Sequence, residues 1–186
     1  MINNRRDNKF PIIRLPFLAI EEIFKTMHPI EIINFLMTSK RAKATTKNMT
    51  FYSKYAIGLG IDETMGIAIL GTNNLEQMEE KTAENDGNIL RSVFKYLKDP
   101  VEEWKHVCKY VLDIFKKQTI DTLTLYMDEF VDQNVSIIDF LRTNVKSVNG
   151  CNVLQSEEEN DVDEHGAYLL ANITVANELN SHLQYK

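Results

Sequence analysis

The sequence predicts an α/β or α+β protein in which three N-terminal helices precede a longer array of alternating strands and helices. Three observations predict this fold. Residues 10–48 carry apolar side chains at helical spacing, residues 55–70 contain two short β-like runs, and residues 101–186 alternate helix and strand signals. With 186 residues, 44% of them hydrophobic and 26% charged, the chain has the composition of an ordinary globular protein.

The first predicted module, residues 10–48, consists of three short helices rich in large apolar side chains. Pro16 suits the first turn of a helix, and the second helix restarts at Pro29. The apolar side chains at helical spacing are Phe17, Ile20, Ile23, Phe24 and Met27, then Ile32, Ile33, Phe35 and Leu36. Neighbours such as Ile32 and Ile33 cannot both lie on one narrow stripe, so we expect some to face an internal core and others a second surface. That surface belongs either to the rest of this chain or to another protein.

Residues 51–100 are predicted to form a connecting α/β segment. The runs YAIGLGI (55–61) and MGIAIL (65–70) indicate a β-hairpin that turns at residues 62–64. A polar helix fraying into a loop is expected at 75–88, followed by an apolar run at 89–97. Pro100 is expected to close this segment.

Residues 101–186 are predicted to alternate between helix and strand. Helices are expected at 102–117, 134–144 and 164–173, and strands at 119–127, 146–155 and 173–184. Asn134 or Ser136 is expected to cap the second of these helices. The first helix carries its apolar side at Trp104, Val107, Val111, Ile114 and Phe115.

A period of 28 residues underlies the last part of the chain. The positions of Ile120, Leu123 and Leu125 recur as Val148, Cys151 and Val153, and again as Ala176, Leu179 and Ser181. A leucine-rich-repeat-like strand–helix array would show this period. An ordinary βαβαβ layer without true repeats is the alternative, and both predict a parallel sheet.

Charge and cysteine content limit the classes of partner and compartment. A net charge of −6 argues against nucleic acid, and the basic run Lys40, Arg41, Lys43 and Lys47 reads as a solvated helix face. No signal core and no run of about 20 apolar residues is present, so no membrane is expected as a partner. The two cysteines, Cys108 and Cys151, form no disulfide framework, which predicts a cytoplasmic and/or nuclear protein.

The sequence contains no motif that supports catalysis. Glycine runs lack the spacing and lysine of a phosphate-binding loop. His106 and Cys108 have no second pair to complete a zinc site, and Cys151 with His165 lacks an orienting motif. The acidic run at 157–164 is expected to be a solvated loop. We therefore expect no catalytic, cofactor-binding or metal-binding residues.

The N-terminal module resembles an F-box over residues 10–46. The resemblance rests on Leu15-Pro16, Glu22-Ile23, Met27-His28-Pro29, Ile32 and Ser39-Lys40-Arg41, in that order and spacing. His28 stands where Asp is common, and Ala42 and Ala44 stand where a Trp often follows. The resemblance implies that the module packs on the Skp adaptor of a cullin–RING ubiquitin ligase. The implied adaptor-binding residues are Leu15, Pro16, Ile23, Phe24, Met27, Pro29, Ile32, Phe35, Ser39 and Lys40, with Ile20, Ile33 and Leu36 in the internal core.

The rest of the chain resembles the type 2 F-box-associated region of an expanded nematode family. The similar stretches are Trp104, 110–128, 134–148 and 169–179. This resemblance implies that residues 101–186 form a substrate-recruiting half, which we expect to be truncated because family members are longer. The expected function is a non-catalytic, substrate-recruiting adaptor subunit for an unknown target. The alternative is a free-standing α/β protein-interaction scaffold that is not coupled to ubiquitylation.

Overall fold

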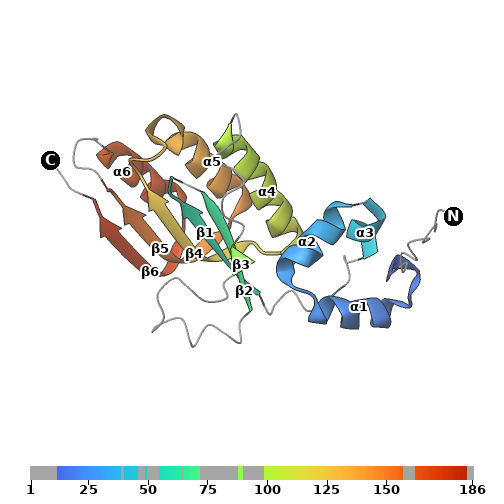
Figure 1. Ribbon diagram of the computed structural model, residues 1–186. Coiled ribbons are helices and arrows are strands. Elements are labelled where there is room, and N and C mark those ends of the chain that lie inside the picture. The colour runs from blue at the N-terminus through green and yellow to red at the C-terminus, as the bar shows by residue number, and fades with distance from the viewer. Residues whose placement is uncertain are drawn as a thin grey trace. The chain divides into compact units, whose positions relative to one another are not determined.

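The computed structural model describes residues 12–38, 40–45, 49, 55–63, 65–71, 88–89, 99–156 and 162–183 (Figure 1). The chain divides into two compact units, Met1–Phe51 and Tyr52–Lys186. Helices make up the first unit, and a mixed sheet with helices makes up the second. The predicted mixture of α and β structure, with the helices first, is confirmed.

The N-terminal unit contains one short 3-10 helix and three α-helices. These are η1 (Ile12–Arg14), α1 (Phe17–Thr26), α2 (Pro29–Met37) and α3 (Lys40–Thr45). Its buried apolar side chains come from all three α-helices and from the segment after them: Ile20, Phe24, Ile32, Ile33, Leu36, Ala42 and Met49. The unit therefore has a core of its own residue types, although it is short for an independent domain.

The second unit is built on a six-stranded sheet with the order β3-β2-β1-β4-β5-β6. The strands are β1 (Tyr55–Ile61), β2 (Gly66–Gly71), β3 (Asn88–Ile89), β4 (Thr119–Tyr126), β5 (Ser147–Leu154) and β6 (Val175–His182). The first three pair antiparallel, whereas β1, β4, β5 and β6 run parallel. The predicted hairpin is confirmed, with Gly60 opposite Gly66 and a left-handed Met65 (φ 46°) at the end of the turn.

Three helices lie along one face of this sheet (Figure 1). They are α4 (Pro100–Phe115), α5 (Asn134–Asn144) and α6 (Asp163–Asn172). Trp104 fixes α4 to the hairpin because its Nε1 donates to the Gly66 carbonyl over 3.4 Å, and its ring meets Phe140 of α5 edge-on at 5.7 Å. The helix and strand predicted for 101–186 are thus all present, each within two residues of its expected bounds.

Pairing between the parallel strands follows the 28-residue period. Ile120 lies opposite Val148, Leu123 opposite Cys151, and Leu125 opposite Val153. On the next strand, Leu179 lies opposite Cys151 and Ser181 opposite Val153, again 28 residues apart. The predicted period is therefore the register of the sheet.

One member of the predicted repeat is displaced. Val148 lies opposite Val175 and not opposite Ala176, because the register shifts between Val148 and Gly150. A bulge of this kind adds a residue to one strand without moving the pairs beyond it. The antiparallel β2 and β3 also show that the strand–helix pattern does not extend through the whole sheet, so the leucine-rich-repeat-like arrangement stays a prediction.

Three local predictions need correction. Pro100 opens α4 as its first residue, after Asp99 accepts a hydrogen bond from the Glu102 N–H over 3.1 Å. The predicted capping of α5 is wrong: Gln133 occupies the cap position, the Asn134 amide donates to the Met127 carbonyl, and Ser136 accepts from Lys105. On α4, Cys108 is fully buried, whereas Val107 is only half-buried. The expectations for 75–87 and 90–97 lie outside the described residues.

Candidate protein-binding surface of the N-terminal unit

The entry into α1 is fixed by Pro16. The Pro16 carbonyl accepts hydrogen bonds from the Ala19 and Ile20 N–H groups at 3.0 and 3.1 Å, which start the helix. Proline has no N–H to leave unpaired, and its restricted φ suits a helix start. Phe17 and Leu18 therefore become the first two side chains of the helix, at an end where few neighbours can cover them.

His28 caps α2. Its Nδ1 accepts a hydrogen bond from the Ile30 N–H over 3.3 Å, and its own N–H donates to the Glu31 carboxylate over 3.0 Å. This reciprocal arrangement is a capping box, in which aspartate, serine or threonine is the usual first residue. The imidazole thus does the work of the aspartate common at this place in the resembled motif.

The core of this unit encloses α2 from two sides. Phe24 of α1 meets Phe35 of α2 edge-on, with ring centroids 5.4 Å apart. On α2 the neighbours Ile32 and Ile33 are both buried, with 0% and 2% of their surface exposed. The expectation that adjacent apolar residues must divide between two surfaces is therefore wrong for this pair, because a helix packed between α1 and α3 buries an arc wider than one stripe.

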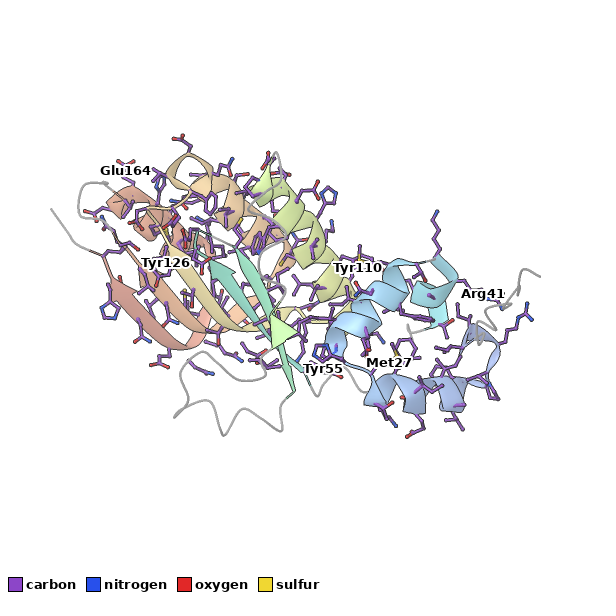
Figure 2. The ribbon with its side chains drawn as sticks, in the orientation of Figure 1. Met27, Arg41, Tyr55, Tyr110, Tyr126 and Glu164 are labelled. Carbon is purple, nitrogen blue, oxygen red and sulfur yellow. The ribbon has the colours of Figure 1, made fainter. Side chains whose placement is uncertain are left out.

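The predicted adaptor-binding residues differ widely in exposure. Pro16 and Lys40 are exposed, and Leu15, Ile23, Met27 and Phe35 are half-buried. Phe24, Pro29 and Ile32 are buried. Figure 2 labels Met27 in the turn between α1 and α2. Ser39 lies outside the described residues. The three residues expected in the internal core, Ile20, Ile33 and Leu36, are all buried.

Three large apolar side chains of this unit are more exposed than any of the half-buried ones. Phe17 exposes 41% of its surface, Leu18 73% and Met37 61%. Phe17 was grouped with the core stripe on spacing alone, and neither Leu18 nor Met37 was singled out. Leu18 follows Phe17 by 100° around the helix, which turns it away from Ile20 and Phe24. Apolar side chains that the chain leaves in water are typical of protein-binding surfaces.

The two thiols of the second unit are unsuited to nucleophilic chemistry. Cys108 and Cys151 are buried, and burial raises the pKa of both thiols, that of Cys151 to about 11. A thiol must ionise to attack, so these groups are unreactive at neutral pH. His165 places its Nδ1 3.4 Å from the Asn134 amide, and His106 lies exposed on α4.

Metal and membrane binding find no support in the described part of the chain. No group of three or more His, Cys, Asp or Glu side chains among the described residues could hold a metal ion. None of the helices described is long and apolar enough to cross a membrane.

Comparison with known proteins identifies one family in this chain. Residues 12–54 match the F-box domain. This range covers η1, the three N-terminal helices and the residues that follow them, and it supports an F-box protein. Neither the curated proteins nor the solved structures contain a match to the chain.

Proposed function

We propose that this chain, which carries an F-box domain at residues 12–54, is a substrate-recruiting adaptor subunit of a Skp–cullin–F-box ubiquitin ligase. The F-box match carries the proposal, since F-box domains generally bind the Skp adaptor. Such a subunit performs no chemistry itself. It raises the local concentration of a target's lysines near the charged ubiquitin-conjugating enzyme, which is catalysis by proximity.

The adaptor contact is assigned to the accessible apolar side chains of the N-terminal unit. They comprise the exposed or half-buried residues of the motif, Leu15, Pro16, Ile23, Met27, Phe35 and Lys40, together with Phe17, Leu18 and Met37. Interfaces derive most of their energy from a few apolar anchors that become fully buried on binding. These side chains retain the exposed area that such burial requires.

Phe24, Pro29 and Ile32 receive a different role in this proposal. They are buried in the chain by itself, so their motif positions serve to hold α1 and α2 in place. The ring contact between Phe24 and Phe35 supports this role, because Phe35 is half-buried and can contact both the core and a partner. Ser39 keeps its predicted contact role.

The second unit is proposed as the recruiting half, similar to the type 2 F-box-associated region. The 28-residue register between β4, β5 and β6 supports a repeat-based unit of the leucine-rich-repeat kind. A hydrogen bond continues this spacing beyond the strands, since the Asp128 carboxylate accepts from the Ser156 N–H over 2.8 Å. We place the protein in the cytoplasm and/or nucleus, where cullin–RING ligases act.

Co-purification of the full chain with the Skp adaptor tests the function. In the Leu15→Ala, Pro16→Ala double variant, truncation of a contact Leu costs about 1–3 kcal/mol, so adaptor affinity should fall roughly ten- to a hundred-fold. The second unit should stay folded, which far-UV circular dichroism checks. Wild-type affinity in the double variant would reject the assignment of the contact. A chain that never co-purifies with the adaptor would favour the free-standing scaffold.

Target identity needs a separate experiment. Cells expressing the tagged chain should accumulate a ubiquitylated partner when the proteasome is inhibited, and the double variant should not enrich its ubiquitylated form. A partner that is captured equally by both forms and never ubiquitylated would again point to the scaffold.

A further inference from the structure

The last strand of the sheet, β6, presents an uncovered edge. In the strand order, β6 has β5 on one side and no strand among the described residues on the other. All of its residues from Ala176 to His182 are exposed. The row that leads to it is buried at Leu123 (0%) and Cys151 (1%) but 44% exposed at Leu179. An unpaired edge of this length readily pairs with another strand.

A ladder of polar side chains crosses the opposite face and also ends at β6. The Asn152 amide donates to the Thr124 hydroxyl over 3.2 Å, and the Asn180 amide donates to Asn152 Oδ1 over 3.1 Å. The same Asn180 amide donates to the Glu178 carboxylate over 3.3 Å. Asn180 Oδ1 accepts no hydrogen bond from any described residue. The ladder can therefore extend by one more donor beyond β6.

The part of β6 that can accept a partner is centred on Asn180. The register shift at its start lies before Glu178, and the residues from Glu178 to His182 pair regularly with β5. Bulges obstruct pairing at sheet edges, whereas a regular stretch permits it. Asn180 is the middle residue of these five.

We propose that β6 pairs antiparallel with β6 of a second copy of this chain, about a two-fold axis at Asn180. Side chains alternate between faces along a strand, so Glu178, Asn180 and His182 share one face. An antiparallel pair centred on Asn180 sets Glu178 opposite His182 of the other copy, and the symmetry does so twice. It also sets the two Asn180 amides opposite each other, where each Oδ1 meets a donor.

This self-complementarity favours a second copy over a parallel strand from another protein. In an isologous contact every favourable pair occurs twice. Opposite charges that face each other across an antiparallel pair are stabilising, and like charges are destabilising. Both members of the Glu178–His182 pair lie on the same strand, so no other partner is needed to supply them.

The helical layer adds apolar area on the same side. Arg142 of α5 reaches the next helix, where its guanidinium donates to Asn172 Oδ1 over 3.1 Å. The residue 28 positions later is Leu170 of α6, which is 46% exposed and so occupies the place that faces away from α5. Leu170 and Leu179 together give the dimer contact an apolar part, although a single strand edge with one helix is smaller than a standard interface. A micromolar dissociation constant follows.

Sedimentation velocity on the full chain tests the dimer up to roughly 100 µM, well above a micromolar dissociation constant. The wild type should pass from monomer to dimer with concentration. Glu178→His and His182→Glu should each weaken dimerisation roughly tenfold, because each replaces two attractive pairs with two like-charge or uncharged pairs. The double variant with both changes restores the opposite charges and should restore the wild-type constant.

His106→Glu provides the matched control, since it makes the same charge change on the exposed face of α4 and should leave dimerisation unaltered. A wild type that stays monomeric at 100 µM would overturn the proposal. So would a dimer that is insensitive to both single variants, or a double variant that remains as weak as the singles.

Discussion

Leu18→Ala is the sharpest test of which N-terminal side chains contact the adaptor. Leu18 is 73% exposed in the second position of α1, so it contributes little to the core. Alanine keeps the helix intact because it has the highest helix propensity. The free energy of unfolding should therefore change by less than about 0.5 kcal/mol. The adaptor affinity should change considerably more.

The size of the affinity loss follows from the area that Leu18 exposes. The substitution removes three carbon atoms, and burying each is worth about 0.8 kcal/mol. Only the fraction exposed in the free chain, 73%, remains to be buried on binding. The expected loss is about 1.8 kcal/mol, which raises the dissociation constant about 20-fold.

Isothermal titration of the purified full chain with the Skp adaptor measures this change. Thermal unfolding followed by circular dichroism measures stability in parallel. Asn34→Ala is the matched control, because Asn34 is an exposed polar residue of α2, and its affinity should stay within about twofold of wild type. Wild-type affinity in Leu18→Ala would show that exposure does not identify the contact surface. A clear loss of stability would show that Leu18 belongs to the core.

Four further predictions follow from other features. Phe24→Ala should destabilise the helical unit by about 3–5 kcal/mol, seen in thermal unfolding; an unchanged melting temperature would contradict its core role. His28→Ala should cost about 0.5–2 kcal/mol in the same assay, whereas His28→Asp should cost nothing, since aspartate caps equally well. The pKa of Cys151 rises on folding from 9.0 to about 11, so the fold holds the proton that the unfolded chain loses. Stability should therefore fall as pH rises through this range, less steeply in Cys151→Ala; parallel curves would refute this. In dilute protein, residues 175–182 should exchange amide hydrogens faster than 119–126, and equal protection by mass spectrometry would mean that the edge is covered.

The sequence was sufficient to predict the elements of the second unit because their signals are local. Alternating Leu123 and Leu125 indicate a strand, and the recurrence of this pattern after 28 residues fixes which strands pair and in what register. The one-residue displacement at Val175 could not be predicted. It depends on a bulge, and a bulge conserves the apolar pattern on both of its sides.

Burial within the N-terminal unit was harder to predict. Periodicity identifies the apolar stripe of an isolated helix, but the width of the buried arc depends on how many helices surround it. Ile32 and Ile33 are both buried for this reason, and Leu18 is exposed although it is as apolar as its neighbours. The cap role of Asn134 failed similarly, because its amide is occupied by the Met127 carbonyl, which only the folded chain brings near.

The position of β1 beside β4 determines the order in which the second unit can fold. The segment from β4 to β6 needs only contacts about 28 residues apart, such as Leu123 with Cys151. Docking of the hairpin joins residues 64 apart, as in the hydrogen bond from the Ile57 N–H to the Asp121 carboxylate. Closing the longer loop costs only about 0.6–0.8 kcal/mol more, so the hairpin can join an array that has already formed. Contacts distant in sequence nonetheless form late. We therefore expect refolding in two phases, a fast one for the array and a slower one for the arrival of β1 and β2.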